Sequence, residues 1–277
     1  MTYGSGSHHS ATSESGLHVA IIMDGSGRWA EARGLSRAEG HRAGRAAVRR
    51  VVQAALESGI RVLTLFTFSS DNWGRPANEV SELMQTFEEF FRADAPALAA
   101  QGARVTAIGR RDRLPMSLRT AIEKVEGLWH SRLRGTTPLA AERGSILPES
   151  SDDGDKVRPA EAKLHVRFAI DYSGRGAILE AARLFSGSSD DSAGTFARLL
   201  AGMAPGSEHV PDIDLLIRTG GELRLSNCPL WEIAYAELYF TPCLWPDFGP
   251  AELDAALQEF QIRHRRFGRI STVASCS

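Results

Sequence analysis

The chain of 277 residues is long enough to bury a substantial core, and as an α/β protein it fits one domain. Its 32 Lys and Arg residues nearly balance its 34 Asp and Glu residues, so no global basic field favours nucleic acid and any anion binding must be local. No apolar run approaches the ~20 residues of a membrane span, and the three cysteines lack metal-ligand or redox spacing, as expected for a cytoplasmic, reducing compartment.

The domain boundaries follow from local composition. The first residues are small and polar and lack the apolar centre of a signal peptide. We expect residues 1–16 to be a disordered lead-in, residues 17–270 to form a single domain and residues 271–277 to be a tail. Residues 135–162 contain glycines, prolines and an acidic cluster without apolar periodicity, which predicts a flexible insertion rather than a metal site.

The first predicted strand spans residues 18–23, where apolar residues are continuous, as in a buried parallel strand. Gly25 and Gly27 then allow the backbone to turn tightly and to approach a ligand. We expect a loop with basic residues to lead into an alanine-rich helix; these residues are Arg28, Arg37 and His41. Because free backbone N–H groups point outward at such a junction, we predict an anion site.

Asp24, at the end of this strand, permits two interpretations. A carboxylate beside a phosphate repels it unless a cation lies between them, so Asp24 could bind Mg²⁺ that bridges to a diphosphate. The alternative is an Asp that only forms the turn at a strand end, the commoner role of an isolated Asp-Gly pair.

The next elements again place polar residues at the end of a buried strand. A helix face from Ala43 to Ala55 is followed by Gly59, which we expect to end the helix. Residues 62–68 form the second predicted strand, and residues 69–76 form a polar loop after it. Ligands bind at this edge of open α/β sheets, so the loop is a second candidate for the site.

An apolar helix face follows, and it can serve as core or as the wall of a hydrophobic substrate site. It consists of Val80, Leu83, Met84, Phe87, Phe90 and Phe91. Further on we predict strands over residues 104–108 and 164–170, with a helix over 115–128 between them. Polar residues 171–175 precede another helix, and residues 185–192 are expected to be a polar linker.

The third polar stretch follows a strand that ends at Ile217. Arg218, Arg224 and Ser226 could bind a second diphosphate through charge-assisted hydrogen bonds. The alternative is a surface loop with solvated arginines, which is weakened because three such loops each follow an apolar strand. Glu237 lies in an apolar segment and needs a metal or an arginine as a partner if it is buried. A last helix is predicted over residues 250–263.

The three polar stretches belong to longer motifs. These are Met23-Asp24-Gly25-Ser26-Gly27-Arg28-Trp29-Ala30 with Gly40-His41-Arg42-Ala43-Gly44, then Phe68-Ser69-Ser70-Asp71-Asn72-Trp73-Gly74-Arg75-Pro76, and last Arg218-Thr219-Gly220-Gly221-Glu222 with Arg224, Ser226 and Trp245-Pro246-Asp247-Phe248. Together they resemble the motifs of cis-prenyltransferases, whose type member is undecaprenyl diphosphate synthase. The resemblance covers nearly all of residues 18–268. It implies a homodimer of a single-domain α/β fold, with a central, mostly parallel sheet flanked by helices and a hydrophobic product tunnel.

The resemblance also implies an enzyme that uses Mg²⁺ to condense isopentenyl diphosphate with an allylic diphosphate, forming a cis double bond. It implies Asp24 and Asn72 as catalytic residues and Asp24 and Glu237 as metal ligands. The residues that it implies for substrate binding are Gly25, Ser26, Gly27, Arg28, Trp29, Arg37, His41, Ser69, Trp73, Arg75, Arg218, Arg224 and Ser226. A phosphate oxygen, or a water held by Asp24 and Asn72, is a candidate base for the departing proton. A lipid product suggests peripheral contact with a membrane.

Four residues depart from the family pattern, among them Ser173, where the family more often has Gly. Ser26 and Asp171 each stand where the family usually has Asn, and a carboxylate near a diphosphate needs a metal or an arginine to offset it. Thr67 stands where long-chain relatives often carry alanine. A larger, β-branched residue would narrow the tunnel and shorten the product, unless Thr67 points into the core instead.

We favour an ordinary cis-prenyltransferase that makes a Z-configured polyprenyl diphosphate. A specialised relative with a short or irregularly coupled product is supported only by Ser26 and Asp171. A non-catalytic partner subunit should have lost its diphosphate ligands, but this chain retains them.

Overall fold

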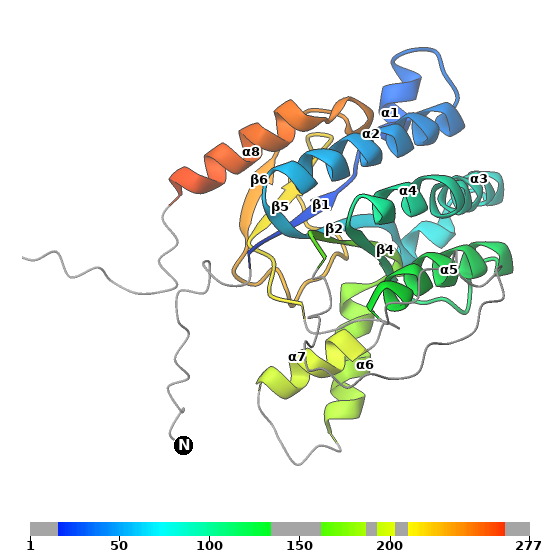
Figure 1. Ribbon diagram of the computed structural model, residues 1–277. Helices are drawn as coiled ribbons and strands as arrows, with labels where there is room; N and C mark the ends of the chain where they lie inside the picture. Colours follow the sequence, from blue (N-terminus) through cyan, green and yellow to red (C-terminus); the bar gives the residue numbers. More distant parts are fainter. Residues whose placement is uncertain (1–15, 134–161, 187–192, 203–209, 264–277) are drawn as a thin grey trace, which may run out of the picture.

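A six-stranded sheet forms the centre of the structure, a computed structural model that describes residues 16–133, 162–186, 193–202 and 210–263 (Figure 1). The strand order is β3-β4-β2-β1-β5-β6, and every neighbouring pair is parallel. The strands are β1 (Leu17–Ile22), β2 (Ile60–Ser69), β3 (Ala103–Ile108), β4 (Leu164–Tyr172), β5 (Leu215–Arg218) and β6 (Glu237–Phe240). The α-helices are α1 (Ser26–Glu31), α2 (Arg37–Glu57), α3 (Ala77–Glu89), α4 (Ala95–Ala100), α5 (Met116–Leu133), α6 (Gly174–Phe185), α7 (Ala193–Gly202) and α8 (Pro250–Ile262). Shorter elements are the 3-10 helices η1 (Ser70–Gly74) and η4 (Trp245–Asp247) and the π-helical turn η2 (Phe90–Asp94).

Helices cover both faces of this sheet (Figure 1). On one face, residues such as Val19, Leu63 and Val166 pack against α2, α3, α4, α5 and α8 in the main core. On the other face, Ala20 belongs to a second core that includes Ala177 of α6. Burial on both faces explains why the strands have continuous apolar sequences rather than alternating ones.

Helix α2 is fixed at its start and along its length. Ser36 Oγ accepts a hydrogen bond from the Glu39 N–H at 3.3 Å, and Glu39 accepts one from the Ser36 N–H at 2.8 Å, which forms a capping box. A Cβ on Gly40 would lie 2.2 Å from the Ser26 carbonyl oxygen, so the glycine lets α2 lie directly against α1. Helix α2 is thereby held against the glycine turn after β1.

The predicted α/β fold and its parallel sheet are confirmed, and each predicted strand coincides with one of β1 to β5. Helix α1 occupies residues that we expected to form a loop, and α7 was not predicted. Helix α6 includes Phe185, which we had assigned to a linker; residues 187–192 of that linker lie outside the described residues. The lead-in over 1–16 and the insertion over 135–162 lie almost wholly outside the described residues, as does the whole of the tail, and all three stay predictions. Among the described helices, none has the length and apolar character needed to cross a membrane.

Candidate active site

The candidate site lies at the edge of the sheet where the strands end. Because the strands are parallel, the polar stretches that follow β1, β2 and β5 come to the same edge. The Asp24 N–H donates to the Thr219 hydroxyl at 2.9 Å, and this hydroxyl lies 2.7 Å from the Asp24 carbonyl oxygen. The Asn227 side chain donates to Ser173 Oγ at 2.9 Å and so links the loop after β5 to the loop after β4. Polar segments far apart in the sequence therefore form one site.

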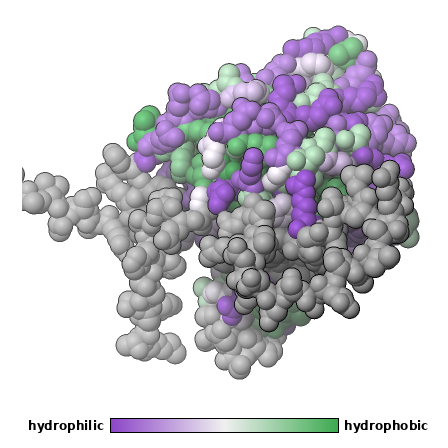
Figure 2. All heavy atoms as spheres, viewed as in Figure 1, coloured by the Kyte–Doolittle hydropathy of each residue, from purple (hydrophilic) through white to green (hydrophobic). Residues whose placement is uncertain are grey.

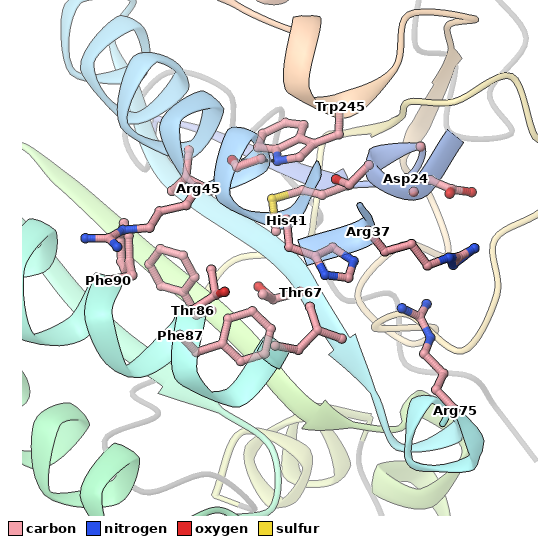
Figure 3. A pocket seen from close by; sticks show the side chains of 18 of the residues that line it. Asp24, Arg37, His41, Arg45, Thr67, Arg75, Thr86, Phe87, Phe90 and Trp245 are labelled. Carbon is pink, nitrogen blue, oxygen red and sulfur yellow. Dashed lines mark hydrogen bonds between the residues drawn. The ribbon is translucent and has the colours of Figure 1, made fainter. Parts of the chain in front are cut away.

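A cavity of about 230 Å³ opens at this edge, between the sheet and helices α1, α2 and α3. Figure 3 shows Asp24, Arg37 and Arg75 at one end and Phe90 toward the opposite end, with Phe87 between them. The other lining residues are Met23, Gly25, Ser26, Gly27, Arg28, His41, Gly44, Arg45, Val48, Thr67, Leu83, Thr86, Phe91, Phe168 and Trp245. An anionic head group and an apolar tail match the two ends of this cavity. Thr67, whose orientation the sequence left open, lines the cavity.

Asp24 lies between two arginines. Its Oδ1 accepts a hydrogen bond from Arg28 Nη2 at 3.3 Å, and its Oδ2 accepts one from Arg218 Nη2 at 3.0 Å. The Arg218 side chain is 4% exposed, whereas that of Asp24 is 31% exposed. The two guanidinium groups offset the repulsion between this carboxylate and a bound anion, and the carboxylate stays accessible from the cavity.

Two glycines let the loops after β1 and β5 approach each other. Gly25 has a φ of 109° and caps α1, and Gly220 has a φ of 86°. A Cβ on Gly220 would lie 2.8 Å from Arg28 Nη2. Since other residues adopt such φ values only under strain, both positions require glycine. The glycines keep Arg28 and Asp24 in contact with the loop after β5.

Arg37 and Arg75 reach the polar end of the cavity from different elements and share one carboxylate. Glu79 Oε1 lies 3.0 Å from Arg75 Nη1 and 3.7 Å from Arg37 Nη1. Glu79 is only 8% exposed, so it holds two exposed cations at the cavity entrance. The pair supplies the forked donors that suit diphosphate oxygens.

His41 contributes a ring nitrogen that needs a partner. Its Nδ1 is buried, and it has no hydrogen-bond partner among the described residues. Burial lowers the pKa of His41 to about 4, so its imidazole is neutral at pH 7 and carries one N–H donor. Because His41 lines the cavity, a ligand bound there can supply the partner that this nitrogen lacks.

Arg218 organises the loop after β5. Its Nη1 donates to Ser226 Oγ at 2.9 Å and also to the Arg224 carbonyl. The Arg224 side chain is 62% exposed and pairs with Glu222. The three residues predicted to hold a second diphosphate thus lie together beside Asp24, outside the cavity lining.

The loop after β2 is held by its own side chains. The Ser69 N–H donates to Asn72 Oδ1 at 3.0 Å. Trp73 packs edge-on against Phe68, with ring centroids 5.3 Å apart. The cavity lining includes none of Ser69, Asn72 and Trp73. Their roles in substrate binding and catalysis stay predictions.

Asp171 has the arginine partner that its position requires. This residue is 1% exposed, and its carboxylate accepts hydrogen bonds from Arg113 Nε and from Ser70 Oγ, each at 2.8 Å. The Arg113 guanidinium also lies 5.3 Å from the centre of the Trp73 ring. The ion pair neutralises the extra carboxylate and fixes the start of η1.

Two further predicted site residues, Trp29 and Glu237, also lie outside the cavity lining. Trp29 Nε1 donates to Asp247 Oδ1 at 2.7 Å and does not line the cavity. Glu237 begins β6 at the start of β5, whereas Asp24 follows the end of β1. The strand register therefore places the two carboxylates at opposite ends of the sheet, and within one chain Glu237 is not a second ligand of a metal at Asp24. Its partner is Arg263, at 3.2 Å.

The site offers Mg²⁺ one carboxylate rather than a cage of protein ligands. No three His, Cys, Asp or Glu side chains gather in the part of the chain that the structure describes. Mg²⁺ in phosphate sites commonly takes one or two carboxylates and completes its octahedron with phosphate oxygens and water. Asp24, accessible at the polar end of the cavity, fits such a substrate-held ion.

Sequence reasoning missed several residues of this site. Glu79 stands four residues after Arg75, the spacing of a helical ion pair, which was the available signal. Arg45 follows His41 at the same spacing on α2. Trp245 was noted only as part of a motif, although its Nε1 donates to the Gly44 carbonyl at 3.0 Å and the ring lines the cavity.

Comparison with known proteins agrees with this geometry. The prenyltransferase family model of undecaprenyl diphosphate synthases matches residues 22–142 and 147–268. Isoprenyl transferase 1 of Bradyrhizobium diazoefficiens is 43% identical over 257 residues, which cover 93% of this chain and 91% of that protein. The isoprenyl transferase of Aquifex aeolicus is 40% identical over 257 residues, 91% of this chain and 96% of that protein.

A solved structure extends the similarity to the fold. Lavandulyl diphosphate synthase from Lavandula x intermedia, crystallised with dimethylallyl diphosphate, is 35% identical with a TM-score of 0.74, covering 91% of this chain and 97% of that one. The chain therefore belongs to the undecaprenyl diphosphate synthase family and is a cis-prenyltransferase.

Proposed function

We propose that the cavity binds an allylic diphosphate, with the diphosphate at its polar end and the hydrocarbon along its aromatic wall. The observation that carries this proposal is the combination of Arg28, Arg37 and Arg75 with an apolar opposite end in one cavity. Charge-assisted hydrogen bonds suit the diphosphate, and each buried CH₂ contributes about 0.8 kcal/mol. The similar lavandulyl diphosphate synthase was crystallised with an allylic diphosphate, which supports this assignment.

Isopentenyl diphosphate binds at the loop after β5. Arg224 is exposed there, and Ser226 lies within hydrogen-bond distance of Arg218, which itself contacts Asp24. The two diphosphates then lie on either side of the Asp24 carboxylate. This arrangement brings the isopentenyl double bond toward the allylic carbon.

The residues of the chain orient both substrates and stabilise the leaving group. The arginines at the polar end stabilise the charge that develops on the diphosphate as its bond to the allylic carbon breaks. The isopentenyl double bond attacks that carbon, and the proton leaves to a phosphate oxygen or to a water held by Asp24 and Asn72. A Mg²⁺ ion bound by Asp24 and diphosphate oxygens would neutralise part of the diphosphate charge.

Substitutions at the two diphosphate sites test this assignment. Arg224→Ala removes a charge-assisted contact and should raise the KM for isopentenyl diphosphate roughly 10- to 100-fold, with little effect on the allylic substrate. Arg37→Ala, the matched control at the other site, should show the reverse pattern. Equal weakening of both substrates in either variant would contradict the division into two sites.

A homodimer is part of the proposal. Strand β6 is an edge of the described sheet and its residues are half-buried. Although Arg263 Nη1 donates to its outward Leu238 carbonyl at 2.8 Å, this edge offers a surface that a second copy can cover. Figure 2 shows hydrophilic residues over α1 and α2 and hydrophobic ones below α8, where β6 lies in the same view. Sedimentation velocity should give the mass of two chains. Cytoplasmic location and membrane contact stay predictions.

A further inference from the structure

Arg45 is a charged residue in the largely apolar half of the cavity, where a hydrocarbon gives no reason for a charge. It lines the cavity in company with Val48, Thr86 and Phe90, yet its side chain is only 20% exposed. Figure 3 shows Arg45 and Phe90 at the end of the cavity opposite Arg37 and Arg75. A charged side chain at the far end of an apolar tunnel needs a structural reason.

That reason is an ion pair between α2 and the π-helical turn η2. Arg45 Nε lies 2.5 Å from Oδ2 of Asp94, whose side chain is 7% exposed, and Arg45 Nη1 pairs with Glu89. The ion pair ties α2 to the end of α3 and to η2, across the far end of the cavity. Arg49 also binds Asp94, at 3.1 Å, but it does not line the cavity.

Aromatic rings complete the closure. Phe90 and Phe91 belong to η2, and both pack against Phe168 of β4, with ring centroids 4.8 and 5.4 Å apart. All three rings line the cavity. The turn that carries Asp94 thus also carries two of the rings that form the end wall.

The closed cavity has room for a short hydrocarbon. A cavity of about 150 Å³ binds benzene, which corresponds to about 25 Å³ per carbon. The 230 Å³ here therefore hold at most about nine carbons, because the diphosphate occupies part of the same cavity. Arg37 and Arg45 are eight residues apart on α2, a rise of about 12 Å. An isoprene unit adds four bonds to the chain, which extend it by about 4.5 Å when the chain is fully stretched. Two to three isoprene units therefore span the distance from Arg37 to Arg45.

We propose that Arg45, held by Asp94 and Glu89, closes the product cavity and limits the product to about 10 to 15 carbons. The inference rests on the proposed placement of the allylic tail in this cavity. Arg45 is in this view a specificity-determining residue: it touches the end of the chain and not the reacting atoms.

Product analysis tests the proposal with a matched pair of variants. Arg45→Ala should lengthen the products by at least one isoprene unit, because it removes the barrier while Arg49 still pairs with Asp94. Arg49→Ala, which alters the same ion-pair network outside the cavity, should leave the distribution unchanged. Phe90→Ala opens the same end without touching the ion pair and should also lengthen the products. Wild-type products beyond about 15 carbons, or unchanged distributions in both Arg45→Ala and Phe90→Ala, would overturn the proposal.

A binding series separates this inference from the catalytic assignment. Without isopentenyl diphosphate, allylic diphosphates of 5, 10, 15 and 20 carbons are titrated against the wild type and Arg45→Ala. Wild-type affinity should rise with length up to about 15 carbons and then stop rising, whereas Arg45→Ala should bind the 20-carbon compound about tenfold tighter than the wild type does. A cut-off in binding without turnover would contradict the catalytic assignment and leave the role of Arg45 supported. Affinity that rises equally in both proteins would contradict the role of Arg45.

Discussion

The Asp24 side chain illustrates how much of the chemistry depends on single residues. Of the two predicted metal ligands, Asp24 is the one that lines the cavity. Two arginines donate hydrogen bonds to its carboxylate oxygens. Its predicted role is to position a cation that acts on the leaving diphosphate. Such an interaction matters most in the transition state, so it belongs to turnover rather than to substrate affinity.

Asp24→Ala should therefore abolish turnover while leaving the fold and most of the allylic affinity intact. We expect kcat to fall by at least 100-fold with little change in KM, the pattern of a lost transition-state interaction. Steady-state kinetics at saturating Mg²⁺ measure both constants. An unchanged kcat would remove Asp24 from the mechanism.

The Arg113–Asp171 pair gives a prediction on stability. Asp171 is almost fully buried, and Arg113→Ala would leave its carboxylate with Ser70 as its remaining side-chain donor. We expect a loss of roughly 1–3 kcal/mol in the free energy of unfolding. Urea denaturation of Arg113→Ala and of the wild type measures this loss.

Arg110→Ala is the control for that experiment. Arg110 pairs with Asp112, and the two side chains are 60% and 62% exposed. A solvent-exposed pair contributes little to the free energy of unfolding, so this variant should stay close to the wild type. Equal losses in the two variants would mean that burial of Asp171 has no energetic consequence.

At the scale of elements, the contact between α1 and α2 depends on a glycine. Gly40→Ala would place a Cβ 2.2 Å from the Ser26 carbonyl oxygen, a backbone atom that cannot rotate away. Gly127, in the middle of α5, has no atom within 4 Å of its would-be Cβ. Both glycines lie in α-helices, but a Cβ would collide with a backbone atom at Gly40 and would meet open space at Gly127.

Gly40→Ala should lower the free energy of unfolding by about 1–3 kcal/mol through overpacking. Gly127→Ala should raise it by about 0.5–1 kcal/mol because alanine is the better helix former. Thermal melts of the two variants and the wild type measure these changes in stability. A stabilised Gly40→Ala protein would contradict the close approach of α1 and α2.

Sequence patterns predicted most of the strands and long helices but missed the short helix α1. The continuous apolar runs identified β1 to β5 because burial on both faces imposes that pattern. Helix α1 was missed because Gly25 and Gly27 are also what a loop needs, and a helix of six residues has no apolar periodicity. Arg37, His41 and Arg75 were predicted for the site and line the cavity, whereas the role of Arg45 depends on a partner 49 residues away, which no local pattern encodes.

At the scale of the whole molecule, the sheet buries two histidines on the face opposite the cavity. His18 Nε2 lies 2.9 Å from Thr64 Oγ1, and His165 Nε2 lies 2.9 Å from Thr106 Oγ1. Burial lowers the pKa of His18 to about 3 and that of His165 to about 2. Both rings are therefore neutral in the folded protein at pH 7.

Stability should fall as the pH falls below the ordinary histidine pKa of about 6.5, because the unfolded chain then binds protons that the folded chain does not. From pH 7.5 to 5.0 each histidine should cost about 2 kcal/mol. Urea denaturation at both pH values measures this loss together with that of His41, whose pKa burial lowers to about 4, so His165→Gln should remove about a third of it. Identical midpoints for the wild type at the two pH values would contradict neutral burial of these rings.

The most direct test of the whole account is condensation itself. The purified protein is incubated with radiolabelled isopentenyl diphosphate and a panel of allylic diphosphates, with and without Mg²⁺, and the products are sized and their double-bond geometry determined. We expect Mg²⁺-dependent incorporation of label into a Z-configured prenyl diphosphate. No incorporation with any allylic partner, or a product whose new double bond is trans, would contradict it.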